Sequence, residues 1–110
     1  MAITNTTILA TSTVIYTSSG QSAITSVIIC NTATYDPANP LTGLTYLSLH
    51  AVKSGQSDGT VNKIVNQLPI PAGETVNFDS EKLVLDNGDR LIAYSASPAN
   101  LVSTVSSLPV

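Results

Sequence analysis

The sequence has few charged residues, and this shortage excludes several classes of partner. Four lysines and arginines stand against seven aspartates and glutamates in 110 residues, for a formal net charge of −3. Four basic side chains cannot form the basic stripe that nucleic-acid binding requires, nor the polybasic cluster that holds a protein on an anionic membrane surface. We therefore expect neither nucleic acid nor a membrane as a partner.

Long apolar runs and paired cysteines are also lacking. No run of about 18 apolar residues is present, so no transmembrane helix is expected. The opening residues MAITNTTILATS lack the basic segment and the apolar stretch of a secretory signal, which indicates synthesis in a cytoplasm. Cys30 is the only cysteine, so it has no partner for an internal disulfide, and its apolar neighbours predict a small buried side chain.

Motifs that carry chemistry are lacking as well. The chain contains no phosphate-binding loop, dinucleotide fingerprint, zinc spacing or nucleophile elbow. His50 is the only histidine, and no motif places a nucleophile and an orienting acid beside it, so we expect an outward-facing polar residue on a strand. The sequence therefore predicts a protein that is not an enzyme and that holds no metal or cofactor.

Serine and threonine, fourteen of each, supply most of the polar side chains. Threonine favours strands because its branched Cβ fits a pleated surface. A hydroxyl needs one hydrogen bond when it is covered, whereas a buried charge is costly unless it is paired, and protein interfaces are correspondingly poor in lysine and acids. This composition is typical of a protein that stays in contact with other proteins.

Turn residues recur every 8–12 residues, which is the spacing of an all-β sandwich or barrel. We predict one domain over residues 1–110, an antiparallel β-sandwich of jelly-roll or immunoglobulin-like type with seven to eight short strands and no long helix. Residues 1–9 could extend from it as an N-terminal arm. In one strand, Leu47, Leu49 and Ala51 would face inward. The strands are expected within Thr7–Ser18, Ser22–Thr32, Leu44–Val52, Thr60–Ile70, Ala72–Phe78, Leu83–Ser97 and Leu101–Val110.

The segment LVLDNGDRLIAYSAS, Leu83–Ser97, places two aspartates around an Asn-Gly pair. Asn-Gly is a strong hairpin signal, and the acids lack the continuation of a calcium loop, so we interpret the tip as a turn and not as a metal or catalytic site. A two-residue hairpin would pair Val84 with Leu91. Both faces of these strands would then be partly apolar, which indicates either cover from a neighbouring copy or scattered surface aliphatic residues.

The second half of the chain, Ile70–Val110, runs through an "AG-T" turn, a "KLVL" strand, a "GD" turn, an "A-AS" strand and a closing "V-VS" strand. In Thr13–Thr34 a short strand containing Ile-Tyr-Thr precedes a long apolar strand that ends in Asn31. This series resembles small virion proteins of tailed bacteriophages, particularly those that infect marine bacteria and cyanobacteria. The loop Tyr35–Gly43 is longer than the usual one in that family.

The resemblance implies a β-sandwich without catalytic residues that is located on the virion. It would bind in many copies as a capsid decoration or cement protein, as homotrimers or other homo-oligomers, with the major capsid protein or another virion subunit as partner. Many modest interfaces then add through effective concentration. The candidate contact residues, chosen for expected exposure and apolarity, are Ile3, Ile8, Leu9, Tyr35, Pro37, Pro40, Leu41, Leu108 and Val110.

Four alternatives stay open at this point. The chain could be a neck, tail or baseplate subunit of the same virion, which copy number would separate from a decoration protein. It could be a glycan-binding or adhesion module at the host surface, for which Tyr35 and Tyr46 are the plausible aromatic pair. A hydrolase is the third alternative, although no nucleophile–base pair can be named. If the resemblance is accidental, a host β-sandwich with a soluble partner is the fourth.

Overall fold

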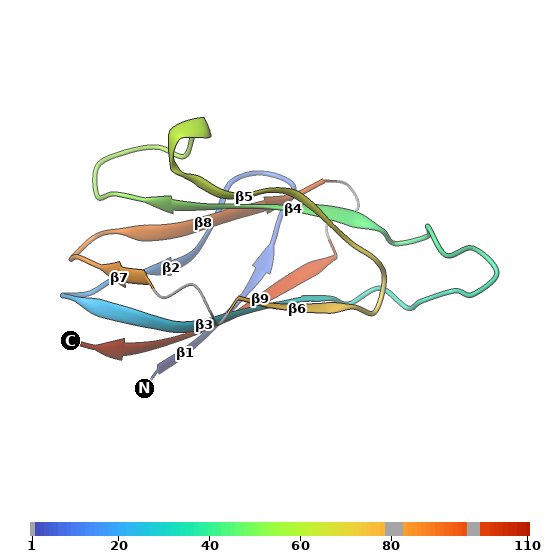
Figure 1. The fold of residues 1–110 in the computed structure, drawn as a ribbon, viewed down its shortest axis with the longest axis horizontal. Coiled ribbons are helices and arrows are strands. Elements are labelled where there is room, and N and C mark those ends of the chain that lie inside the picture. The colour runs from blue at the N-terminus through green and yellow to red at the C-terminus, as the bar shows by residue number, and fades with distance from the viewer. Residues whose placement is uncertain (1, 79–82, 97–99) are drawn as a thin grey trace.

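The computed structural model describes residues 2–78, 83–96 and 100–110, which form two antiparallel sheets packed face to face (Figure 1). The first sheet contains β1 (Ala2–Ile8), β9 (Leu101–Pro109), β3 (Ser22–Asn31) and β6 (Thr75–Phe78) in that order, and β7 (Leu83–Leu85) pairs with β3 beside β6. The second sheet contains β2 (Thr13–Thr17), β8 (Arg90–Ser95), β4 (Thr45–Val52) and β5 (Lys63–Ile70). A single 3₁₀ turn in these ranges, η1 (Thr60–Asn62), precedes β5.

The predicted all-β sandwich is confirmed, and the strand order identifies it as the jelly-roll type. The two sheets have the strand orders 1-9-3-6 and 2-8-4-5, with β7 as a short addition, and successive strands change sheets except at β4–β5 and β6–β7. The described residues hold nine strands instead of seven to eight. Residues 2–8, which we expected could form an arm, make an edge strand that pairs with β9 along its whole length. No helix in the described ranges is long and apolar enough to cross a membrane.

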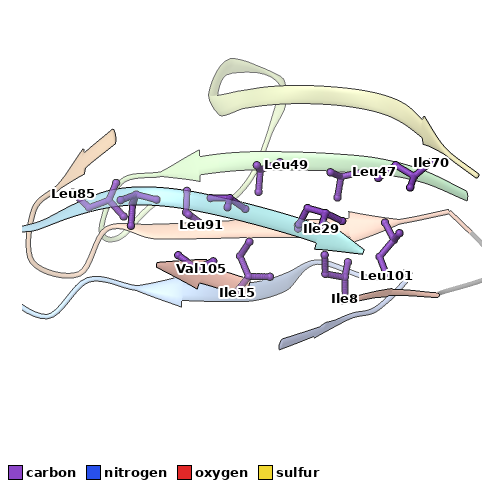
Figure 2. Packing of buried hydrophobic residues seen from close by; sticks show 13 residues of the cluster. Ile8, Ile15, Ile29, Leu47, Leu49, Ile70, Leu85, Leu91, Leu101 and Val105 are labelled. Carbon is purple, nitrogen blue, oxygen red and sulfur yellow. The ribbon is translucent and has the colours of Figure 1, made fainter. Parts of the chain in front are cut away.

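The core lies between the sheets and is built from the inward side chains of both (Figure 2). Leu47 and Leu49 are buried and Ala51 packs against them, as the alternating pattern predicts. Burying a leucine or isoleucine side chain contributes roughly 1.5–3 kcal/mol, so this cluster is the main stabilising element of the fold. Its buried members are Ile8, Ile15, Ile24, Val27, Ile29, Leu47, Leu49, Ile70, Leu85, Leu91, Ala93, Leu101 and Val105.

The Asn-Gly turn does not form the predicted hairpin. β7 pairs with β3 in one sheet, whereas β8 pairs with β2 and β4 in the other, so the turn between them carries the chain from sheet to sheet. The predicted pairing of Val84 with Leu91 is therefore wrong. Gly88 has φ +87° while Asn87 stays at negative φ, which is the pattern of a type II turn. The favoured two-residue hairpin turns, types I′ and II′, both require positive φ at the first central residue, so a type II turn does not match the twist of two neighbouring strands.

A long segment between β3 and β4, residues 32–44, projects beyond the sheets at the end of the molecule opposite both termini (Figure 1). A second segment, residues 53–62 between β4 and β5, folds back over the outer face of the second sheet. There the Ser12 hydroxyl donates to Asp58 Oδ2 at 2.6 Å, and Asn62 reaches His50. Ile92, on that same outer face, is only 4% exposed. The second apolar face of β8 is thus covered in part from within the chain.

Candidate functional site

The described strands of the five-stranded sheet carry no charged side chain. Within their described bounds β1, β3, β6, β7 and β9 contain no lysine, arginine, aspartate or glutamate. Residues directly opposite each other in antiparallel strands share a face, so the pairing register identifies the side chains that point away from the core. We call this set the uncharged face; its members are Ile3, Asn5, Thr7, Ala23, Ser26, Ile28, Cys30, Thr75, Asn77, Val84, Val102, Thr104, Ser106 and Leu108.

In the described part of the chain, no element packs against the uncharged face. Its members are exposed or half-buried, whereas their inward neighbours on the same strands are mostly buried. Ile3 and Val84, near its two margins, are 64% and 66% exposed. The prediction that Cys30 is buried is wrong, because Cys30 pairs with Thr75 and Val102 on this face and is only half-buried. An open, flat and uncharged sheet surface is suited to contact with another protein surface.

The free edge of β1 continues this surface. β1 is seven residues long and pairs with β9 on one side, and no described strand pairs with its other side. Natural proteins protect edge strands with charges, proline or bulges. β5, an edge of the other sheet, has Lys63, Pro69 and irregular register, whereas β1 has none of these. Its backbone groups are therefore available to another extended strand.

The described charged residues lie away from the uncharged face. They are in connecting segments, at the start of β5 or at the start of β8. Asp79, Glu81 and Lys82 lie outside the described residues. The charges that are described are Asp36, Lys53, Asp58, Lys63, Glu74, Asp86, Asp89 and Arg90.

The predicted contact residues do not form one patch. Ile3 and Leu108 lie on the uncharged face, and Leu9 and Val110 are exposed just beyond β1 and β9. The other exposed candidates are on the projecting segment of residues 32–44, at the end of the molecule opposite Ile3, Leu108 and Val110 (Figure 1). Ile8 is wrong as a contact residue, because it faces the core and is 0% exposed. The exposed residues of the projecting segment are Tyr35, Pro37, Pro40 and Leu41.

Asn31 holds the base of the projecting segment and was not predicted to have this role. Its side chain is buried, with Nδ2 donating to Gly43 O at 2.8 Å and to Ile70 O at 2.9 Å. Its Oδ1 accepts from Ala33 N at 3.0 Å. The two ends of the segment are thereby tied to the end of β3. The signal in the sequence was an asparagine at the end of an apolar strand, where an amide can satisfy backbone groups of a neighbouring turn.

The acidic turn is a structural corner. Asp89 accepts from Ser54 N at 2.9 Å and from Asp86 N at 3.0 Å, and these bonds hold the pKa of its carboxyl below the usual range. Asn87 Oδ1 accepts from Gly20 N at 2.9 Å. In the residues that the structure describes, no group of three or more histidine, cysteine, aspartate or glutamate side chains could hold a metal ion.

His50 is buried, not exposed as predicted. It points to the outer side of its sheet, but the segment of residues 53–62 lies over it and leaves it 2% exposed. Its Nδ1 lies 2.8 Å from Asn62 Oδ1, which also accepts from Gly59 N, so Nδ1 is the donor. The ring stacks on Tyr94 at a centroid distance of 5.7 Å. Among the described residues, Nε2 has no hydrogen-bond partner. The local sequence could not show that the segment of residues 53–62 would fold over this side chain.

Tyr35 and Tyr46 do not share a groove among those found in the described residues. Tyr35 lies near Gly73 at the base of the projecting segment, whereas Tyr46 lines a groove on β4 together with Tyr94. The aromatic pair expected for glycan binding is therefore not assembled from these two residues. Comparison of the chain with protein-family models, with curated proteins and with solved structures found no match in any of the three.

Proposed function

We propose that this protein is a structural subunit of a virus particle that works by attachment, as a decoration protein that bridges capsid subunits of a tailed bacteriophage. The observation that carries the proposal is the uncharged face: a whole sheet surface of hydroxyl, amide and aliphatic side chains that no described element covers. The assignment to a virion comes from the sequence resemblance. Jelly rolls occur in viral capsid and lectin domains, which is compatible with it by analogy of fold alone.

The chemistry of the uncharged face favours a lasting contact. Covering it removes no charged group from water, and each serine or threonine needs only one hydrogen bond from the partner. Its area follows from strand geometry: four strand positions about 4.8 Å apart, and about 30 Å along β9, give roughly 570 Å². Standard interfaces bury about 800 Å² on each partner. A second contact is therefore needed, and the β1 edge or the projecting segment would supply it.

Many such contacts in one shell act together. A subunit held by two modest interfaces to adjacent capsid subunits gains from effective concentration, since release requires both contacts to open together. The proposed mechanism is thus mechanical bridging, with no catalytic step and no cofactor. Pairing through the β1 edge offers a route to self-association, as homo-oligomeric attachment requires.

Quantitative mass spectrometry of purified particles tests the assignment. A decoration protein is expected in hundreds of copies per particle. A count near six or twelve would favour the neck, tail or baseplate alternative, because closed rings set small numbers. The absence of the chain from the particle would overturn the virion proposal.

A pair of lysine variants tests which surface makes the attachment. Ser106 lies on the uncharged face between Ile3 and Ser26, so Ser106→Lys would place an unpaired charge in the contact. Val61→Lys adds the same charge on η1, where the side chain is 94% exposed. We expect Ser106→Lys to weaken co-sedimentation with undecorated capsids by about tenfold or more, and Val61→Lys to leave it unchanged. Equal binding by the two variants would show that attachment uses another surface.

A further inference from the structure

A groove on the outer face of the second sheet, on the side of the sandwich opposite the uncharged face, has the features of a ligand site. Its volume is about 420 Å³, and no charged side chain lines it. Ligand sites for small molecules are commonly a few hundred Å³ in volume, with aromatic walls and a few fixed polar groups. The groove is lined by Ala10, Tyr46, Ser48, Gln67, Tyr94, Ser95 and Ala96.

Two tyrosines from adjacent strands form the aromatic part of the groove. Ser48 pairs directly with Tyr94, and Ala96 N donates to Tyr46 O at 3.0 Å, so Tyr46 and Tyr94 are diagonal neighbours on one face. Diagonal aromatic side chains are close enough to act together. Tyr94 is held in place by the stacked ring of His50 and by Lys63 Nζ, 5.9 Å from the ring centre. Tyr46 is 43% exposed and free to meet a ligand.

Gln67 is strained at this groove. Its φ of +50° is the one positive value at a non-glycine residue in the described ranges. It sits where the β4–β5 register shifts, so that Asn66 and Gln67 together oppose Ser48, and its N–H donates to Ser48 Oγ at 3.3 Å. Glycine is the ordinary residue for such a bulge, because any other residue pays a backbone cost there. A glutamine kept at this costly backbone conformation beside a groove indicates that its side-chain amide has a role in binding there.

We propose that this groove binds a neutral saccharide of one or two pyranose rings. The C–H face of a pyranose packs on tyrosine rings, and its hydroxyls need partners that both donate and accept, as the Gln67 amide and the Tyr46 phenol do. A lining without charge fits an uncharged ligand, and its only aliphatic side chains, Ala10 and Ala96, are too small to form a deep apolar pocket for a peptide anchor. The proposal goes beyond attachment and does not depend on it. On a particle held by the uncharged face, this groove would point outward.

The test is titration of the isotope-labelled full chain with defined neutral sugars, followed by NMR chemical shifts. The probes are N-acetylglucosamine, methyl α-glucoside, maltose, cellobiose and lactose. We expect at least one of them to shift the amide signals of Gln67, Tyr46 and Tyr94 in a saturable manner at millimolar concentration. If none of the probes shifts these signals, the proposal is overturned.

Variants then tie the binding to the groove. Tyr94→Ala and Tyr46→Ala are expected to weaken the binding probe about tenfold or more, which corresponds to ~1.4 kcal/mol. Tyr35→Ala is the matched control, because Tyr35 is equally exposed, at 50%, outside the groove. Tyr46→Ala decides the question if Tyr94→Ala does not fold. Affinity that Tyr46→Ala leaves unchanged, or that Tyr35→Ala lowers as much, contradicts a site at these residues.

Gln67→Gly separates function from stability. This substitution removes the backbone strain, so the melting temperature is expected to stay equal or rise, while sugar affinity falls about tenfold or more. A residue with a structural role alone would not combine an equal or higher melting temperature with weaker sugar binding when it is replaced. Wild-type affinity in Gln67→Gly would show that the amide is not used and would overturn its part in the site.

Discussion

At the scale of single residues, Asn31 shows how one buried amide can organise a long loop. Its side chain makes three hydrogen bonds, which join Gly43, Ile70 and Ala33 at the base of the projecting segment. Buried backbone groups that lose their partner keep the full cost of leaving water. The position of the exposed loop residues therefore depends on a side chain that never touches a partner.

Asn31→Ala is expected to lower the free energy of unfolding by about 2–4 kcal/mol, because it leaves two carbonyls and one N–H at the base of the segment without a hydrogen-bond partner. Urea denaturation of the variant measures this loss. Asn77→Ala is the control, since Asn77 is exposed on the uncharged face. A loss no greater than that of the control would show that water replaces the amide at the loop base.

The lowered pKa of Asp89 predicts that the turn between β7 and β8 contributes less to stability in acid. Its folded pKa is lowered, first by the hydrogen bond from Ser54 N and then by that from Asp86 N, so ionised Asp89 stabilises the fold. This contribution is present above the unfolded pKa of about 3.9 and is lost as the pH falls through the lower folded value. We expect unfolding free energy to drop less between pH 7 and pH 3 in Asp89→Asn than in the wild type. Parallel curves would exclude this role.

At the scale of elements, the turn between β7 and β8 is one of the connections that carry the chain from one sheet to the other. Gly88 N donates to Ser18 O and Ser18 N to Asp89 O, both at 2.9 Å, so this corner is bonded to the β2–β3 turn. Gly88 has positive φ, and an added Cβ would lie 2.7 Å from Ser54 Oγ and 3.1 Å from Ser54 Cβ. Side chains are therefore excluded here both by backbone conformation and by space.

Gly88→Ala and Gly88→Val are expected to destabilise the protein by about 1–3 kcal/mol, measured by thermal or urea unfolding. Gly55→Ala is the matched control: its φ is +83°, and nothing lies within 4 Å of the added Cβ. The control should show only the cost of positive φ. A loss in Gly55→Ala as large as in Gly88→Ala would mean that the contact with Ser54 contributes nothing.

At the scale of the whole molecule, the two outer faces differ in chemistry. One is the uncharged face, with the open β1 edge beside it. The other carries the tyrosine groove, and the segment of residues 53–62 covers part of its remaining surface. Because the two sheets pack face to face around the core, their outer faces point in opposite directions (Figure 1). The proposed attachment and the proposed sugar binding would therefore use opposite sides of one molecule.

Because the two proposed binding surfaces lie on opposite sides of the molecule, a substitution on one should not affect binding at the other. Ser106→Lys changes the attachment face and should leave sugar binding intact, whereas Gln67→Gly changes the groove and should leave capsid co-sedimentation intact. Distant, independent sites are expected to behave additively. Loss of both activities in either single variant, with the fold preserved, would contradict the separation of the two surfaces.

The sequence by itself determined the strand content, the inward positions of Leu47, Leu49 and Ala51, and the sandwich class, because side-chain alternation and turn chemistry are local properties of the chain. The small number of charged residues also made an uncharged sheet possible. The virion role stays a prediction from resemblance.

Only the tertiary structure decided which sheet each strand joins, and with that the jelly-roll type, the corner at Gly88 and the edge position of β1. It also buried His50 and Ile8, left Cys30 only half-buried and placed Gln67 and Tyr94 in one groove. The physical reason is that strand partners and covering loops are chosen over long separations, and bulges shift the register between them. Such choices leave no trace in the pattern of any one segment.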